Sequence, residues 1–185
     1  MKIRFNSPLI LTFTIICCLV MMGAQLLGDQ LVIAFFSVHP GIQASEPMWY
    51  WRLFSHVLGH SDWIHFMGNF SMILLLGPLL EEKYGAWILL EMMLITAVIT
   101  GLINACFFSS ILLGASGIVF MMILLASFSN FQDGEIPLTF VLVATFYLGQ
   151  EIIHALEPDK ISQMAHIVGG LCGALFGFKR KIFSE

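Results

Sequence analysis

The residue in this chain whose type and context best suit chemistry is a serine between two glycines, in Gly114-Ala115-Ser116-Gly117. It stands at the start of an apolar run. One interpretation is structural, because serine caps helix starts and glycine permits tight turns and close packing. The other is catalytic: a nucleophilic hydroxyl at a helix start, where backbone N–H groups can receive an oxyanion. The tetrapeptide alone favours the structural interpretation, since short motifs occur by chance.

A histidine in a later apolar segment supplies a candidate base. His166, Gly169 and Gly173 are spaced i, i+3 and i+7, which places them on one stripe of a helix. A glycine stripe lets another helix approach closely, and Ser116-Gly117 offers a small surface for that approach. The contact would bring the imidazole towards the serine hydroxyl. A lone membrane histidine can also be a structural hydrogen bonder, but its pairing with the serine favours a nucleophile and a base.

Two further polar residues, His65 and Asn69, are four apart and so share one helical face. They either join helices by hydrogen bonds or complete an oxyanion hole with the Ser116 backbone N–H. The nearest carboxylate, Asp62, belongs to the membrane interface. We therefore expect a Ser–His dyad rather than a triad.

A metal site has to be considered because His56, His60 and His65 are spaced by four and five residues. The chain has no HExxH motif, and Asp62 is the only carboxylate near these histidines. We predict neither a metal nor a cofactor.

The elements that must position these residues belong to a membrane protein. The 185 residues are 58% hydrophobic and 11% charged, with a mean hydropathy of +0.91, which is typical of one polytopic membrane domain over residues 1–185. The net charge of −4 comes with scattered basic residues, which excludes a nucleic-acid-binding patch. The four cysteines lie in apolar runs and are predicted to form no disulfide.

Apolar runs of spanning length predict an all-α fold with six transmembrane helices. The mixed aromatic segment 28–62 does not cross, and the first run lacks a convincing cleavage site, so it is interpreted as a retained span. The predicted spans cover about 9–27, 63–80, 86–108, 116–129, 136–156 and 163–178.

Six spans place both termini on one side of the membrane. That side then holds six of the eight basic residues, which predicts cytoplasmic termini by the positive-inside rule. The six are Lys2, Arg4, Lys83, Lys179, Arg180 and Lys181, against Arg52 and Lys160 outside.

The predicted fourth span is short. Its fourteen residues reach about 21 Å, against a hydrocarbon core of about 30 Å. The link 107–115 must then descend as non-helical backbone, which is tolerated only inside protein or beside water. Ser116 is therefore expected at the bottom of an outward-facing cavity within the membrane.

These motifs resemble those of the rhomboid intramembrane serine proteases, in the order that the family has them. Gly114-Ala115-Ser116-Gly117 is similar to the family's GxSG motif, and the segment from Ala165 resembles AHxxGxxxG. The other matches are Trp51-Arg52 with the WR pair, His60, His65 and Asn69 with HxxxxHxxxN, and Gly77, Glu81 and Gly85 with GxxxExxxG. The six-span count resembles the basic form typical of bacteria.

The resemblance implies an integral protein of the bacterial inner membrane, whose partners are the lipid bilayer and transmembrane protein substrates. Ser116 would attack the scissile carbonyl and His166 would act as base and then acid. His65 and Asn69 would hold the oxyanion with the Ser116 N–H. The fifth span and the loop before the sixth would gate the substrate path, with Phe146 and Tyr147 as natural gate residues.

One departure from the family pattern concerns the fourth span. Phe120 and Met121 stand where the family often has glycine after the serine, so we expect looser or repositioned packing of the fourth span on the sixth. Two functions from other classes remain as alternatives. One is a small transporter that uses His65, His166, Asn69 and Glu151, although the chain has no internal repeat of the kind common in carriers. The other is a non-catalytic membrane protein that binds client helices.

The remaining polar and aromatic residues have simpler interpretations. Trp51 and its aromatic neighbours predict a belt at the interface, and Arg52 is expected to be a local hydrogen bonder. Glu81 and Glu82 are expected to form a solvated helix end. The sequence leaves open the oligomeric state, the substrate and the roles of Glu91 and Glu151.

Overall fold

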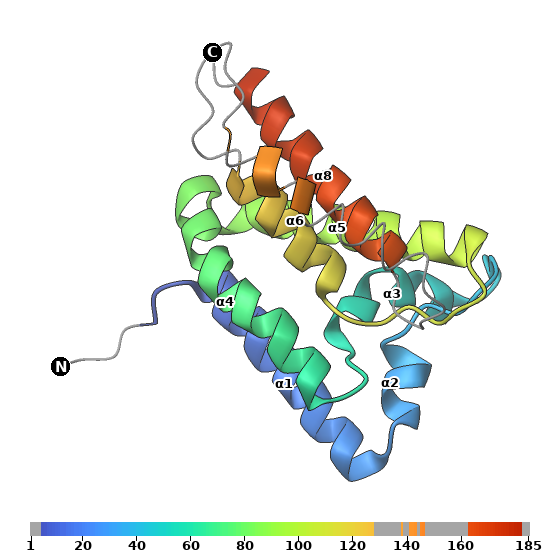
Figure 1. Cartoon of the computed structure of the whole chain (residues 1–185). Helices are drawn as coiled ribbons and strands as arrows, with labels where there is room; N and C mark the ends of the chain where they lie inside the picture. Colours follow the sequence, from blue (N-terminus) through green and yellow to red (C-terminus); the bar gives the residue numbers. More distant parts are fainter. Residues whose placement is uncertain (1–4, 128–137, 139–140, 144, 147–162, 183–185) are drawn as a thin grey trace.

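The computed structural model describes residues 5–127, 138, 141–143, 145–146 and 163–182. Their secondary structure is helical, and the only pairing of β type in this part of the chain is an isolated bridge between Val38 and Leu112. The helices, in the order of Figure 1, are α1 (Pro8–Leu27), α2 (Gln30–Phe35), α3 (Pro47–Ser55), η1 (His56–Leu58), α4 (Trp63–Tyr84), α5 (Ala86–Phe107), α6 (Ser116–Ser127) and α8 (Gln163–Ile182).

Three of these helices, α1, α4 and α5, are long and apolar enough to cross a membrane. The helix α6 and the segment Gln163–Phe178 of α8 are shorter apolar helices. The prediction of an all-helical membrane protein is thus confirmed for the described residues. Most of the predicted fifth span, 136–156, lies outside them, together with Tyr147 and Glu151.

The start of α1 is fastened to the end of α4 by a buried carboxylate. Glu81 accepts the backbone N–H groups of Leu9 at 3.0 Å and Ile10 at 3.1 Å, two of the donors that a helix start leaves unpaired. Gly77 allows this approach, because a Cβ there would lie 2.6 Å from the Cδ1 atom of Ile10. The prediction of a solvated end was therefore wrong for Glu81, although Glu82 is exposed.

The helix α4 is longer than the predicted span. The helix continues through Glu81 to Tyr84 and ends where Gly85 adopts a φ of +80°, a conformation that favours glycine. The next helix begins at once, at Ala86.

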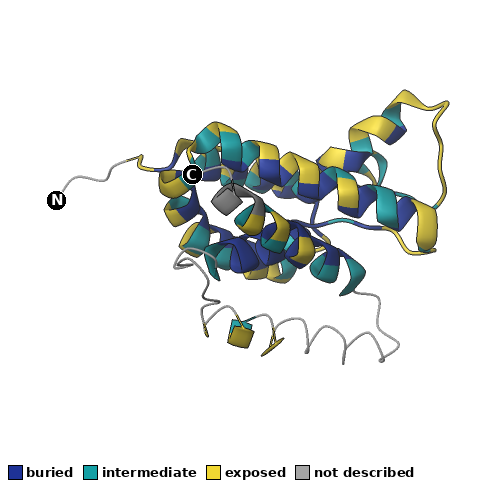
Figure 2. Ribbon diagram, turned by 90° about the horizontal axis from the view of Figure 1, so that it is seen from above, coloured by how far each residue is buried: buried dark blue, intermediate teal, exposed yellow. Residues whose placement is uncertain are grey.

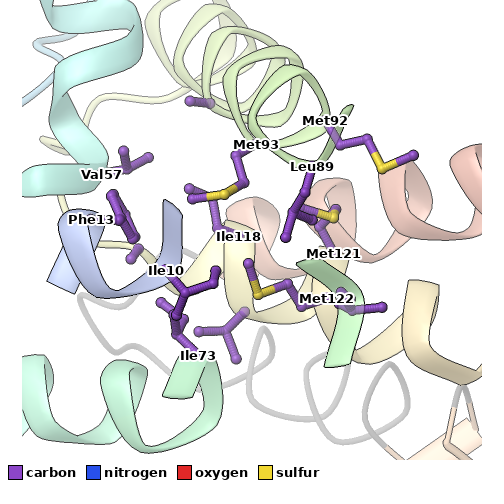
Figure 3. Packing of buried hydrophobic residues seen from close by; sticks show 14 of the residues in the cluster. Ile10, Phe13, Val57, Ile73, Leu89, Met92, Met93, Ile118, Met121 and Met122 are labelled. Carbon is purple, nitrogen blue, oxygen red and sulfur yellow. The ribbon is translucent and has the colours of Figure 1, made fainter. Parts of the chain in front are cut away.

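The helix α6 lies at the centre of the molecule. Every residue from Gly117 to Leu125 is buried, as expected of a helix that is apolar on all sides and enclosed by its neighbours. It packs against α4, α5 and most extensively α8, and Figure 1 shows α6 and α8 side by side. Figure 3 shows core side chains of α1, α4, α5 and α6 meeting, and Figure 2 shows the exposed positions on the outer helix faces.

The segment between α1 and α4 is organised by hydrogen bonds from α3 to the end of α2. Trp51 Nε1 donates to the Phe35 carbonyl at 2.9 Å, and Ser55 Oγ donates to the same oxygen at 2.8 Å. Arg52 Nε donates to the Ala34 carbonyl at 2.8 Å. These donors satisfy carbonyls that a helix end leaves unpaired, so Arg52 is the local hydrogen bonder that the sequence predicted.

The link between α5 and α6 is non-helical, as predicted, and it is fastened to the preceding loops. Val38 and Leu112 exchange two backbone hydrogen bonds of 2.8 and 3.0 Å. Closer to α6, the Gly114 N–H donates to the His56 carbonyl at 2.9 Å. The backbone that leads into Ser116 is therefore held by groups on both η1 and the loop after α2.

Candidate active site

Ser116 is the first residue of α6 and is half-buried. The Ala115 carbonyl already accepts a helical bond from the Val119 N–H at 3.0 Å, so the helix begins directly at the serine. The first N–H groups of a helix have no partner within it, and they favour negative charge. The backbone N–H of Ser116 is therefore a candidate donor for an oxyanion.

Gly114 brings this helix start against α4. Its φ is +114°, which favours glycine. A Cβ at this position would lie 2.6 Å from Cε1 and 2.8 Å from Nε2 of His65, and 3.8 Å from Nδ2 of Asn69. The two polar side chains predicted on α4 therefore meet at the backbone that precedes Ser116. Asn69 is buried, and its Nδ2 has no hydrogen-bond partner within the described part of the chain.

His166 lies near the start of α8, which crosses α6 through two glycines. A Cβ on Gly169 would lie 2.1 Å from the Gly117 carbonyl oxygen, and a Cβ on Gly173 would lie 2.2 Å from that of Met121. Contacts this short do not occur between real atoms, so each glycine is required for the crossing. Ser116 and His166 thus start two helices in backbone contact.

Phe120 packs on the candidate base, a contact that the sequence did not predict. Its ring stacks on His166, with a centroid distance of 4.4 Å and an interplanar angle of 7°. Met121 is fully buried while its backbone faces Gly173, so the expected loosening of α6 on α8 is not observed. Phe120 follows Ser116 by four residues, one helical turn, and this spacing was the signal that could have placed it beside a histidine packed on the same face.

Asp62 is placed at the start of α4, where it is the N-cap. Its Oδ1 accepts the backbone N–H of His65 at 2.8 Å, and its Oδ2 accepts the Ser61 hydroxyl at 2.8 Å. The His65 N–H and the Ser61 hydroxyl hold the pKa of Asp62 below its usual value. The Ser61 hydroxyl also lies 3.2 Å from Nδ1 of His65. On the other side, His65 is close enough to His166 for their charges to interact.

Two neighbouring histidines are buried. His60 accepts the Ala115 N–H at Nε2, at 3.4 Å, and its ring lies 5.0 Å from that of His65. Burial lowers the pKa of His60 to about 3 and that of His56 to about 4, so both are neutral near pH 7. By contrast, the hydrogen bonds of Trp51 and Arg52 go to α2, not to the residues around Ser116.

The structure also describes the residues of the other predictions, which concern a metal site, the cysteines, Glu91 and Phe146. Among the described residues, no group of three or more His, Cys, Asp or Glu side chains is placed to hold a metal ion. The four cysteines are free thiols. Glu91 is exposed on α5, and Phe146 is described and exposed.

The helical fold and the polar residues gathered at the start of α6 describe an integral membrane protein with a candidate serine-hydrolase site. The family model described as the Rhomboid domain matches residues 47–181. The chain is also similar to the Rhomboid protease GlpG of Haemophilus influenzae, with 25% identity over 176 residues that cover 94% of this chain and 91% of the relative. The chain belongs to the rhomboid family, and it is a serine protease of that family.

Proposed function

We propose that this protein is an intramembrane endopeptidase that cuts peptide bonds in or beside the transmembrane segments of other membrane proteins, with Ser116 as nucleophile and His166 as base. The observation that carries the proposal is the glycine crossing of α6 and α8, where a Cβ on Gly169 would lie 2.1 Å from the Gly117 oxygen. A crossing this close favours contact between two side chains that start the facing helices.

The reaction follows from these two groups. The Ser116 oxygen attacks the scissile carbonyl carbon while His166 takes the hydroxyl proton. The tetrahedral intermediate collapses as the C–N bond breaks, and His166 returns the proton to the leaving amine. Water then attacks the acyl-enzyme carbonyl while His166 takes a water proton. The ester C–O bond breaks, His166 returns that proton to the Ser116 oxygen, and the new carboxyl end is released. The stacked ring of Phe120 fixes the plane in which the imidazole exchanges its protons.

The oxyanion is held by the Ser116 N–H with His65 and Asn69. Support comes from the positions of both side chains against Gly114 and from the buried, unpartnered Nδ2 of Asn69. A buried donor without a partner costs about 1–3 kcal/mol. Binding the oxyanion recovers part of that cost, and it does so at the step where negative charge develops.

The remaining motif residues position backbone segments. Gly114 and Gly117, with Gly169 and Gly173, permit the backbone approaches. His60 fastens the Ala115 N–H. Trp51 and Arg52 fasten α2 to α3.

We place this centre in a six-span rhomboid-like domain of a bacterial inner membrane, with both termini cytoplasmic. The predicted fourth span of fourteen residues, 116–129, reaches about 21 Å, which is less than the hydrocarbon thickness of about 30 Å. Ser116 then lies below the external surface, reached by transmembrane substrates from the bilayer. The proposed reaction uses backbone and side-chain groups of the protein, without a metal or cofactor.

The test is cleavage of a reporter with a helix-destabilised transmembrane segment by the purified protein in detergent. Ser116→Ala should abolish cleavage. Ser127→Ala should leave it unchanged, because that hydroxyl donates to the Ile123 carbonyl at the other end of α6. Cleavage that survives Ser116→Ala would overturn the proposal.

A further inference from the structure

Three side chains at the start of α4 form a chain of hydrogen bonds that leads into the proposed oxyanion hole. The Ser61 hydroxyl lies between Asp62 Oδ2, at 2.8 Å, and His65 Nδ1, at 3.2 Å. Asp62 Oδ1 holds the His65 backbone N–H at 2.8 Å. Ser61 and Asp62 are exposed and His65 is half-buried, so the chain runs from the surface towards the site.

The number of available protons fixes the direction of these bonds. Asp62 is ionised near pH 7, since its pKa lies below the ordinary value, and a carboxylate only accepts hydrogen bonds. The single hydrogen of Ser61 is therefore donated to Asp62. The contact between Ser61 and His65 then requires a proton on Nδ1 of the imidazole. A neutral His65 held in this way has no proton on Nε2.

The Nε2 edge of the same ring faces Gly114, in the link that leads into Ser116. It lies 2.8 Å from the position that a Cβ of Gly114 would occupy. For His65 to donate a hydrogen bond to an oxyanion from this edge, both ring nitrogens must carry a proton. If His65 donates from Nε2 while Nδ1 keeps its proton, the ring is therefore an imidazolium.

We propose that Ser61 and Asp62 are positioning residues that hold His65 as an imidazolium while the oxyanion is bound, with the Asp62 carboxylate balancing its charge through the Ser61 hydroxyl. This inference rests on the proposed function of Ser116. His65 takes its second proton from water, and no covalent bond changes. Hydrogen bonds between ions are roughly twice as strong as neutral ones, so the positive donor favours the charged intermediate over the neutral substrate.

Three titratable groups face His65, and Asp62 is the one among them that favours this assignment. His60 contacts its ring but is buried and neutral. His166, on α8, interacts with it electrostatically and opposes a second positive charge. The Asp62 carboxylate carries the opposite charge, and it reaches the ring through the Ser61 hydroxyl.

Two substitutions separate this role from helix capping. Ser61→Ala removes the central hydroxyl. Asp62→Asn keeps a good N-cap residue, but its amide N–H donates to Ser61, which turns the Ser61 hydroxyl towards Nδ1 and leaves the His65 proton on Nε2. Ser71→Ala is the matched control, because Ser71 is exposed on the same helix and its hydroxyl donates to the Gly68 carbonyl.

Nitrogen NMR of protein labelled with ¹⁵N-histidine reads the protonation directly. In the free wild type the neutral His65 imidazole should carry its proton on Nδ1. In the adduct with a fluorophosphonate, whose oxygen takes the oxyanion position, the same imidazole should be doubly protonated. Asp62→Asn should place the proton on Nε2 and stay neutral in the adduct. A wild-type His65 with its proton on Nε2 would overturn the inference.

Reporter cleavage gives the second measurement. Ser61→Ala and Asp62→Asn should each lower kcat about tenfold, less than the ~10²–10³-fold cost of losing an oxyanion donor itself, with KM within about twofold of wild type. The double variant should fall no further than either single one, because the residues act as one unit. Wild-type kcat in Ser61→Ala and Asp62→Asn, with Ser116 still labelled by the fluorophosphonate, would overturn this inference alone. A wild type unlabelled at Ser116 would instead refute the proposed function.

Discussion

The glycine crossing between α6 and α8 predicts a sharp loss of activity in Gly169→Ala. The added Cβ would meet the Gly117 carbonyl oxygen at 2.1 Å, where real Cβ atoms keep at least 3.0 Å. Because the contact is backbone on both sides, α8 must retreat by about 1 Å. Overpacking of this kind costs about 1–3 kcal/mol, and a misplacement of about 1 Å at a reacting group can cost about 10²-fold in rate.

The assay compares kcat for reporter cleavage with the thermal unfolding midpoint in the same detergent. Gly169→Ala should lower kcat by about 10²-fold and the midpoint by about 2–12 °C for a chain of this size. Gly68→Ala is the matched control, since a Cβ at Gly68 meets nothing within 4 Å, and it should retain both values.

The two measurements separate helix placement from general stability. In a preparation that remains folded at the assay temperature, the lost activity should exceed any loss of folded protein. Wild-type kcat and midpoint in Gly169→Ala would refute the inference that Ser116 and His166 are set by this crossing.

Three further predictions test other contacts. Glu81→Ala should lower the free energy of unfolding by about 1–3 kcal/mol, because two N–H groups of α1 lose their acceptor; an unchanged midpoint, or an equal loss in the exposed control Glu82→Gln, would count against it. Phe120→Leu should lower kcat about 2- to 10-fold, the worth of one ring stack, and equal cleavage rates would show that the stack on His166 is incidental. Acidification should destabilise the fold, because His56 and His60 have folded pKa values of about 4 and about 3, below the unfolded value of about 6.5. The unfolded chain therefore binds protons first, and each histidine lowers the free energy of unfolding by about 1.4 kcal/mol per pH unit as the pH falls below about 6.5 towards its folded pKa. In His60→Phe the thermal unfolding midpoint should fall less steeply with pH between pH 6.5 and 5. An unaltered slope would contradict the buried neutral state of His60.

The helix starts were largely predictable because local residues determine them. Pro8 opens α1, and the Asp62 side chain caps α4. Gly85, at a φ of +80°, separates α4 from α5. The ends were less predictable: α4 continues past its predicted end to Tyr84, and Glu81 in its last turn has hydrogen-bond partners on α1, 71 and 72 residues away in the chain.

The candidate site was predictable as a set of residues, and its fine structure was not. Motif spacing placed Ser116, His166, His65 and Asn69 on helix faces, which is the information that a period of 3.6 residues carries. The stacking of Phe120 and the proton chain through Ser61 depend on which helices face one another. Local spacing places a side chain on a helix face, but it does not say which neighbouring helix that face contacts.

The central claim is that Ser116 is a nucleophile activated by His166, and labelling with a fluorophosphonate followed by peptide mapping tests it most directly. The folded wild type should take up one label, on Ser116. Ser116→Ala should take up none, and His166→Ala should label at least about 100-fold more slowly, since residues that act as a unit fail together. A label on another residue, or an undiminished rate in His166→Ala, would contradict the account.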